Sequence, residues 1–418
     1  MARLNILLIN HYAGSVRHGM EFRPYYLARE WVRLGHRVRI VASSTSHIRA
    51  QAPDMGGRAR FDQNIDGVDY TWFATPSYSG NGAARVRNMA SFVWRLLREA
   101  RTLAREVEPD VVIASSTYPL DIWPAHRIAR LAGARLLFEL HDLWPLSPME
   151  LGGYSRWHPF IMLLQAAENH ACRHADAIVS ILPKVREHLE AHGMAPHKLH
   201  IVPNGADPGE WLAAGEALAP ETERVLAAAR SASDCIVGYA GTHGIANALD
   251  TLVETASLLR NRRVAFVLVG GGPEKQRLRL RARTLALDNV YFLDPVPKRQ
   301  VPALLRRFDL AYIGWKRQPL YRFGIAPNKL IDYMMAARPI VHAVEAGNDP
   351  VAEAACGLTV PPEDPQALAD AVVRLMETSA AEREAMGLRG QRHALANLTY
   401  PVLGQRFLNA CAGDLQHG

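Results

Sequence analysis

The sequence is poor in cysteine and lacks long apolar runs. Only 4 of its 418 residues are cysteines, and these are scattered with no C-x-x-C pair: Cys172, Cys235, Cys356 and Cys411. This pattern predicts free buried thiols in a reducing cytoplasm and argues against a metal site. No apolar run reaches the roughly 18 residues that a membrane span needs. The apolar core of the first ten residues is too short for a signal peptide and predicts a buried strand.

Modules that read nucleic acid are also missing. The net charge of +7 suits three kinds of partner, namely nucleic acid, an anionic membrane surface or phosphorylated substrates. A nucleic-acid reader should combine a basic cluster with a known module or an aromatic stacking platform. The sequence shows neither feature, so we expect no nucleic-acid partner.

What the sequence does contain is a regular alternation of short apolar runs with helical patterns. Hydrophobic residues make up 49% and charged residues 21%, which predicts a globular protein with sizeable cores. The predicted strands are 6–9, 38–42, 110–114, 136–140, 177–180 and 200–202, then 235–240, 264–269, 290–293, 310–313, 339–343 and 358–360. This alternation predicts an α/β protein with two doubly wound halves, whose ligands bind at the carboxyl ends of the strands.

The stretch 321–334 carries the most concentrated functional signal. Pro327 suits the first position of a helix, and the unpaired N–H groups of a helix start can hold a phosphate. Lys329 adds a positive charge in the first turn, where a cation needs an anion nearby. Asp332 follows about one turn later, within reach of sugar hydroxyls. The stretch therefore predicts a site for a diphosphate and a ribose, the alternative being an ordinary buried helix.

Two glycine-rich turns follow predicted strands, at 238–244 and 269–273. Glycines let backbone N–H groups approach a phosphate, although tight turns between strands and helices use glycine in any case. At the end of the strand 136–140, His141 could donate a hydrogen bond to a sugar hydroxyl, or else be structural beside a capping Asp142. The long loop 11–23 is predicted to serve an acceptor.

Taken together, these pieces resemble glycosyltransferase family 4, a retaining family with the GT-B fold. The resemblance covers nearly the whole chain and depends on the order of the motifs. In sequence these are Gly35–Val38, His141-Asp142, Val202–Asp207, Gly238–Gly244, Val269–Pro273 and Pro327–Met334. The last motif is similar to that of the branch that transfers acetamido sugars, such as the fucosamine-type transferases of surface polysaccharides.

The resemblance implies two Rossmann-like domains facing across a cleft. Residues 1–205 would form the acceptor-binding domain, 206–398 the nucleotide-sugar-binding domain, and 399–418 a helix crossing back to the first. The implied reaction moves a sugar, an N-acetylated hexosamine or deoxyhexosamine, from a nucleoside-diphosphate sugar to a lipid-linked or glycan acceptor, with retention. UDP is the favoured nucleotide. Neither a metal nor another cofactor is expected, and the location would be cytoplasmic or peripheral on the inner face of the membrane.

The resemblance also assigns roles to residues. Asp332 matches the acidic residue that holds the ribose, and His141 matches the histidine that contacts the donor sugar, with Lys329 as a third catalytic candidate. The donor-binding candidates are Gly241, Thr242, His243, Gly244, Gly270, Gly272, Val296, Phe323, Gly324, Ile325, Ala326, Pro327 and Asn328. The acceptor-binding candidates are His11, Tyr12, Gly14, Glu21 and Arg23.

Two positions depart from the family pattern. Gly324 stands where the first acidic residue of the pair is expected, and Asn247 stands where a lysine often follows the glycine-rich loop. Lys329 is therefore our candidate for neutralising the diphosphate. Two other functions stay open: a GT-B nucleotide-sugar 2-epimerase, which would act on the donor without an acceptor, and a non-catalytic nucleotide-sugar-binding protein.

Two segments, 85–106 and 155–171, combine an apolar helical face with arginines. Basic amphipathic helices with aromatic anchors can lie on anionic bilayers. The alternative is that both helices pack their apolar faces on the first sheet. Many members of the family glycosylate polyprenyl-diphosphate lipids, so the resemblance favours an anionic membrane surface as a partner.

Overall fold

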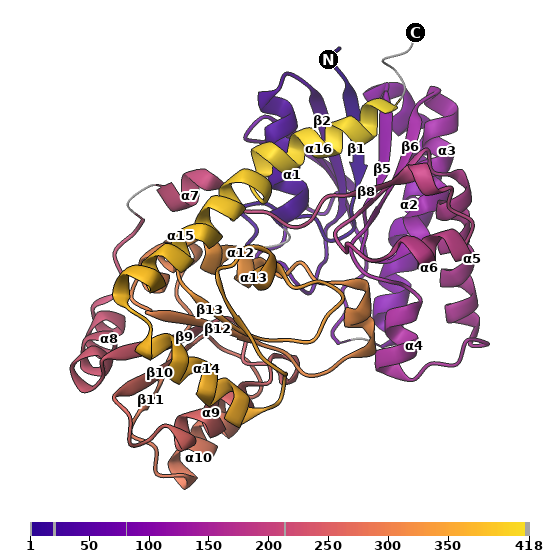
Figure 1. Cartoon of the computed structure of the whole chain (residues 1–418). Coiled ribbons are helices and arrows are strands. Elements are labelled where there is room, and N and C mark those ends of the chain that lie inside the picture. Colours follow the sequence, from indigo (N-terminus) through magenta and orange to yellow (C-terminus); the bar gives the residue numbers. More distant parts are fainter. Residues whose placement is uncertain (1, 20–21, 81, 213–214, 414–418) are drawn as a thin grey trace. The chain divides into compact units, whose positions relative to one another are not determined.

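The computed structural model describes residues 2–19, 22–80, 82–212 and 215–413, which form two compact units (Figure 1). The first unit consists of Met1–Asn204 and Tyr400–Gly418, and the second of Gly205–Thr399. The chain thus leaves the first unit at residue 204 and returns to it at residue 400. Both crossing points lie within one residue of the sequence-based boundaries.

The first unit is built on an eight-stranded sheet with the strand order β3-β4-β2-β1-β5-β6-β7-β8. The strands are β1 Asn5–Ile9, β2 Arg37–Ser43, β3 Arg60–Ile65, β4 Val68–Phe73, β5 Val111–Ala114, β6 Arg135–Leu140, β7 Ala177–Ser180 and β8 Leu199–Ile201. Neighbouring strands are parallel except for β3 and β4, which form an antiparallel hairpin. The apolar runs of the sequence did not indicate this hairpin, although its Asp66-Gly67 turn is a strong hairpin signal.

Seven α-helices of the described chain belong to the first unit. They are α1 Phe22–Arg33, α2 Ala83–Val107, α3 Ile122–Ala132, α4 Leu146–Gly152, α5 Pro159–His174, α6 Arg186–Ala191 and α16 Tyr400–Ala412, with short 3₁₀ turns at Pro119–Asp121 and Pro196–Lys198. The last helix, α16, lies along α1 (Figure 1). The Trp31 indole N–H donates to the Gly404 carbonyl at 3.1 Å, and the Tyr26 and Tyr400 rings stack at 4.7 Å. Helix α16 is therefore part of the core of the first unit.

The second unit contains a six-stranded sheet in the order β11-β10-β9-β12-β13-β14, in which all neighbours are parallel. Its strands, all of them predicted, are β9 Cys235–Ala240, β10 Val264–Val269, β11 Val290–Leu293, β12 Leu310–Gly314, β13 Ile340–Ala343 and β14 Gly357–Thr359. Every residue of β10 is buried, as expected for a strand covered by helices on both faces.

The helices of the second unit connect these strands. They are α7 Pro208–Leu212, α8 Pro220–Ala232, α9 Leu249–Leu258, α10 Lys275–Thr284, α11 Val301–Leu305, α12 Asn328–Met335, α13 Pro350–Glu353, α14 Pro365–Glu377 and α15 Ala380–Asn397, with 3₁₀ turns at Ile245–Asn247, Lys298–Gln300 and Pro319–Phe323. Because β9 and β10 are parallel neighbours, the two glycine-rich turns that follow them lie at the same edge of the sheet.

The structure shows where the cysteines and the apolar face of α2 lie. The four cysteines are buried and unpaired, as predicted. In α2 the apolar face packs inward, since Met89, Leu96 and Leu103 are buried. The prediction that this face lies on a membrane is therefore wrong, because its side chains fill the core of the first unit. Within the described ranges, no helix is long and apolar enough to cross a bilayer.

Candidate active site

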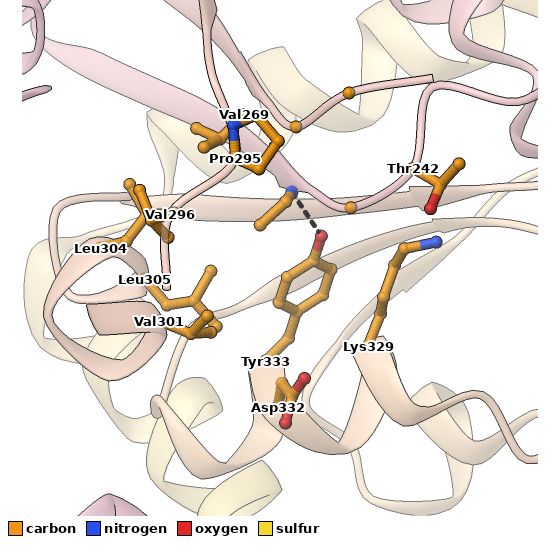
Figure 2. A pocket seen from close by; sticks show the side chains of 14 residues that line it. Thr242, Val269, Pro295, Val296, Val301, Leu304, Leu305, Lys329, Asp332 and Tyr333 are labelled. Carbon is orange, nitrogen blue, oxygen red and sulfur yellow. Dashed lines mark hydrogen bonds between the residues drawn. The ribbon is translucent and has the colours of Figure 1, made fainter. Parts of the chain in front are cut away.

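A cavity of about 500 Å³ lies at the carboxyl ends of β9 and β10 in the second unit (Figure 2). Its lining residues are Ala240, Gly241, Thr242, Val269, Gly270, Gly271, Pro295, Val296, Val301, Leu304, Leu305, Lys329, Asp332 and Tyr333. The volume falls within the range of small-molecule sites, which combine apolar walls with a few polar groups. Here the polar side chains come from the turn after β9 and from α12.

One wall of the cavity is apolar and comes from the turn after β11 and from α11. Pro295 and Val296 of the turn form this wall together with Val301, Leu304 and Leu305 of α11 (Figure 2). Of these residues, only Val296 was predicted to bind the donor. The two prolines that flank Val296 mark a rigid turn after a strand, a signal that could have drawn attention to the segment.

The two glycine-rich turns pack against each other so closely that side chains are excluded. A Cβ at Gly270 would lie 1.9 Å from the Gly241 carbonyl oxygen, and one at Gly272 would lie 2.6 Å from the His243 carbonyl oxygen. The His243 N–H also donates to the Gly271 carbonyl at 2.7 Å. These glycines are therefore required by the contact between the turns, whether or not a phosphate binds there.

Lys329 lies in the first turn of α12 and reaches along the turn after β9. Its ammonium donates to the Asn247 side-chain oxygen at 3.0 Å and lies 5.2 Å from the centre of the Tyr239 ring. Gly241 makes room for it, because a Cβ there would lie 2.1 Å from Lys329 Cε. Burial lowers the pKa of Lys329 to about 8, an effect that Asp332 opposes. The ammonium is thus still largely protonated at neutral pH.

The contacts of Asn247 account for its presence where the family pattern often has a lysine. Its amide N–H donates to the Thr242 carbonyl at 2.9 Å, while its side-chain oxygen accepts from Lys329. A lysine expected at position 247 is thus replaced by an amide that holds the ammonium of Lys329. The positive charge stays beside the turn after β9 but comes from a different helix.

Asp332 lies one turn further along α12 and faces the same cavity (Figure 2). Burial raises the pKa of its carboxyl group to about 7, and Lys298 and Glu210 add smaller, opposing effects. In the part of the chain that the structure covers, no hydrogen bond or ion pair reaches this carboxylate. The neighbouring Tyr333 is different, since its hydroxyl accepts the Ala240 N–H at 3.0 Å and anchors α12 to β9. The Asp332 carboxylate is thus available to accept hydrogen bonds from a ligand in the cavity.

Nine of the predicted donor-binding residues do not line this cavity. They are His243, Gly244, Gly272, Phe323, Gly324, Ile325, Ala326, Pro327 and Asn328. The His243 ring is fully buried, and burial together with Lys275 lowers its pKa to about 4. Its ring is therefore neutral and interior, and it does not line the cavity.

The loop before α12 has a conformation that accounts for the glycine at position 324, where the family pattern has its first acidic residue. Gly324 has a φ of 90°, which a glutamate would rarely adopt. The next residue is held from both sides, because the Ile325 N–H donates to the Asn348 side-chain oxygen at 2.7 Å and the Ile325 carbonyl accepts from the Asn348 amide at 3.2 Å. The backbone of this loop thus has a conformation that favours glycine over glutamate at position 324.

A buried polar network surrounds His141 in the first unit. His141 Nε2 lies 3.3 Å from Glu139 Oε2 and 3.1 Å from Ser115 Oγ. Ser115 donates to Glu139 at 2.6 Å, and Arg23 Nε donates to the other carboxylate oxygen at 2.9 Å. Burial alone would raise the pKa of Glu139, but His141 and Arg23 hold it at about 2. A charged carboxylate therefore faces the imidazole and orients its ring.

Glu139 was missed by sequence analysis, although an acidic residue inside an apolar strand is an unusual signal. It is completely buried in β6, directly before the strand ends. Asp142, in contrast, is structural as the alternative interpretation stated. Its Oδ1 accepts from the Leu143 N–H at 2.8 Å and from the Ser147 hydroxyl at 2.6 Å, which fixes the turn into α4.

The predicted acceptor loop packs largely into its own unit. The Arg23 guanidinium is buried, with its terminal nitrogens donating to the Pro203 and Val202 carbonyls at 2.5 and 2.8 Å. His11 is also buried, lies 2.5 Å from the Tyr118 hydroxyl, and has a pKa lowered by burial to about 3. These contacts correct the predicted acceptor roles of His11 and Arg23.

The remaining acceptor candidates are not brought to the surface either. Tyr12 is buried and its hydroxyl accepts from Arg85 at 3.2 Å, while the Gly14 carbonyl accepts from the Tyr70 hydroxyl at 2.8 Å. Glu21 lies outside the described residues. The apolar and aromatic content of the loop explains this result, because such side chains are stabilised by burial against the sheet.

Two family models match the chain, one on each unit. Residues 18–205 match a glycosyl transferase 4-like domain, and residues 234–378 match glycosyl transferases group 1. Two parallel-sheet units with these matches define a glycosyltransferase of the GT-B fold. More particularly, the chain belongs to glycosyltransferase family 4.

Individual relatives are distant but cover most of the chain. The alpha-D-kanosaminyltransferase of Streptomyces kanamyceticus is 24% identical over 340 residues, which is 78% of this chain and 80% of that protein. Among solved structures, Anabaena HepE in complex with UDP and glucose has a TM-score of 0.67 at 15% identity, covering 98% and 100% of the two chains. WaaG, a glycosyltransferase involved in lipopolysaccharide biosynthesis, has a TM-score of 0.64 at 15% identity, again covering 98% and 100%.

Proposed function

We propose that the cavity of the second unit binds the nucleoside diphosphate of a UDP-sugar donor. The observation that carries this proposal is that an apolar wall, an unpaired carboxyl group and a fixed ammonium line one cavity of about 500 Å³. The wall suits a base, Asp332 suits ribose hydroxyls, and Lys329 suits the diphosphate. The similarity in fold to HepE, which was solved with UDP, supports the choice of nucleotide.

The proposed chemistry follows from where charge develops. As the bond from the sugar to the diphosphate breaks, negative charge builds on the departing phosphate. Lys329 and the backbone N–H groups of the turn after β9 would stabilise that charge in the transition state. Because Lys329 supplies the positive charge, we propose that this step needs no metal. The acceptor would attack from the same face with retention, its proton passing to the departing phosphate, and His141 would contact the transferred sugar.

The nature of the sugar and the acceptor rests on similarity in sequence. The motif Pro327–Met334 resembles that of acetamido-sugar transferases, so we propose an N-acetylated hexosamine or deoxyhexosamine as the sugar. The Streptomyces relative is named for kanosaminyl transfer, and WaaG takes part in lipopolysaccharide biosynthesis. These relatives support a lipid-linked or glycan acceptor in polysaccharide or glycoconjugate synthesis.

Thermal denaturation with a nucleotide panel tests the donor assignment. A ligand that binds only the folded protein raises its melting temperature by mass action. We expect UDP and UDP-sugars to raise it more than GDP, ADP or their sugars. An equal response to all three nucleotides, or none, would contradict the assignment. Incubation with donor alone separates a transferase from an epimerase, because only the epimerase forms a sugar product without an acceptor.

We further propose that the acceptor is presented at a membrane surface. Five large apolar side chains of α4, α5 and the loop between them are exposed, which we call the α4–α5 surface: Leu151, Tyr154, Trp157, Met162 and Leu163. The Arg156 guanidinium lies 4.6 Å from the centre of the Trp157 ring. Exposed apolar and aromatic side chains near a cation suit the interface of an anionic bilayer.

Vesicle flotation with two tryptophan variants tests this proposal. Trp157→Ser should weaken binding to phosphatidylglycerol vesicles by about 10-fold, because it removes the largest apolar side chain from the surface. Trp94→Ser is the matched control, since Trp94 is exposed on α2 outside the α4–α5 surface. Binding should fall as salt rises, because surface charges are screened over about 10 Å at 0.1 M. If wild-type protein ignores these vesicles at low salt, the lipid-linked acceptor is ruled out.

The network around His141 gives a prediction about turnover. Glu139→Gln should lower kcat by about 10-fold, because the neutral amide orients the imidazole less firmly, as with other outer partners of functional histidines. Affinity for UDP should stay unchanged, since the proposed nucleotide cavity is built from the second unit. The matched control is Glu30→Gln, which removes another buried carboxylate that is paired with arginines in α1. A similar loss of kcat in both variants would indicate a purely structural role for Glu139.

A further inference from the structure

A cluster of three potential metal ligands lies in the first unit, where α6 meets α5. Glu168 comes from α5, His188 from α6, and His192 directly follows α6. One oxygen of the Glu168 carboxylate lies 2.9 Å from His188 Nε2, and the other lies 4.0 Å from His192 Nε2. One ligand atom of each residue lies within 4.8 Å of the other two. None of these residues lines the cavity of the second unit.

The hydrogen bond of His192 fixes which of its ring nitrogens can act as a ligand. Its Nδ1 lies 2.7 Å from the His188 carbonyl oxygen. A carbonyl oxygen can only accept, so Nδ1 carries the proton and Nε2 of the neutral ring carries a lone pair. This is the outer contact that orients most metal-binding histidines. His192 Nε2 and Glu168 Oε2 lie 4.0 Å apart, which is too far for a hydrogen bond. Both atoms can donate an electron pair to a metal ion.

The surroundings of Glu168 give a second reason to expect a cation. Its side chain is completely buried, on a helix face that otherwise contributes Leu164, Ala167 and Ala171 to the core. Gln165 orients the carboxylate by donating to Oε2 at 2.8 Å. The carboxylate also accepts a hydrogen bond from His188 Nε2 at 2.9 Å, so a metal ion bound here would take the place of that proton. A buried carboxylate is stabilised by pairing with a cation or by coordinating a metal.

We propose that Glu168, His188 and His192 bind a zinc ion that links α6 to α5. Zinc binds imidazole nitrogen and carboxylate oxygen at about 2.0–2.2 Å, so that tetrahedral ligand atoms lie about 3–4 Å apart. The separations of 2.9 and 4.0 Å bracket that spacing. Three protein ligands leave a fourth position for water. The site would stabilise the first unit and is independent of the donor cavity and of its proposed function. In the sequence, the only local sign of this site is the spacing His-x₃-His of His188 and His192.

Metal binding by the purified full-length protein tests the proposal. After dialysis against a chelator, we expect wild-type protein to bind one zinc ion with a rise in melting temperature, and to give the visible absorption of four-coordinate Co²⁺ when cobalt is used. His192→Asn should weaken zinc binding by about 100-fold or more, since a direct ligand should matter at least as much as an outer partner. Glu168→Gln should also lose binding, and because it could affect folding, the half-exposed His192 provides the decisive variant.

A second histidine cluster supplies the matched control. His126, His170 and His174 lie together on α3 and α5, with His126 Nδ1 2.8 Å from His170 Nε2. The variant His170→Asn should keep full zinc affinity and the cobalt spectrum. If His170→Asn loses the metal while His192→Asn retains it, zinc binds at the other cluster and the proposal is overturned. It is equally overturned if wild-type protein binds no zinc at micromolar concentration.

Discussion

Replacing Lys329 with alanine should lower kcat by about 100-fold at saturating donor, the loss seen when one transition-state donor is removed. The ammonium is fixed beside the turn after β9 by Asn247 and by the space that Gly241 leaves. Its interaction with the diphosphate should strengthen as charge builds on the departing phosphate, so the effect should fall on turnover more than on donor affinity. Steady-state kinetics with excess acceptor, together with calorimetric donor binding, measures both quantities.

The control for this variant is Arg262→Ala. Arg262 is exposed between α9 and the start of β10, at the opposite end of that strand from the cavity. The substitution removes one positive charge from the same unit and should leave kcat within about twofold of wild type, since exposed charges are well screened. An unchanged kcat in Lys329→Ala would refute the role of Lys329 in catalysis.

Replacing Asp332 with asparagine should raise the donor dissociation constant by about 20-fold. Hydrogen bonds to a charged acceptor are stronger than those to a neutral amide by about 1–2 kcal/mol, and the ribose hydroxyls would lose that difference. In wild-type protein the carboxyl group has a pKa of about 7, so donor affinity should increase as pH rises through 7. In the asparagine variant this pH dependence should disappear. Calorimetric titration at pH 6 and pH 8 measures both effects.

The same substitution should stabilise the donor-free protein. Burial raises the pKa of Asp332 from 3.8 to about 7, so below pH 4 the carboxyl is protonated in both the folded and the unfolded chain. As pH rises from about 4 to 7 the unfolded chain binds fewer protons, and the folded state loses stability. The loss at pH 8 is at most ~4 kcal/mol, and water in the cavity reduces it. The Asp332→Asn variant has no ionisable group at this position, so it should not lose this stability at pH 8.

Melting temperatures at pH 4 and pH 8 test this prediction. Asp332→Asn should melt at the same temperature as wild type at pH 4 and at a higher temperature at pH 8. A variant that loses donor affinity but gains stability identifies a residue kept for binding at the expense of stability. If Asp332→Asn were destabilised at pH 8 with unchanged donor affinity, Asp332 would be structural.

Much of the fold follows directly from local patterns in the sequence. Twelve of the fourteen strands in the described chain were predicted from apolar runs, because a parallel strand covered on both faces must be apolar along its length. The hairpin of β3 and β4 was missed because its alternating pattern differs from those runs. Lys329 and Asp332 were found because a charged pair one turn apart after Pro327 is a local signal on one helix.

The surroundings of each candidate residue, in contrast, were decided by tertiary contacts. The sequence shows Gly241, Asn247 and Lys329 far apart along the chain, whereas packing of α12 against the turn after β9 makes the amide hold the ammonium. Tertiary contacts likewise place Arg23 and His11 inside the first unit, although both side chains are polar.

The sequence by itself thus determined the order of the strands and helices, the family, and the residue types available for chemistry. Periodicity and motif order are properties of the chain that do not depend on which segments meet. Only the tertiary structure decided which side chains face a cavity and which are buried, as with Glu139 beside His141 or Glu168 beside His192. The physical reason is that burial and charge pairing depend on residues brought together from distant segments, and these set both the pKa of a group and its access to a ligand.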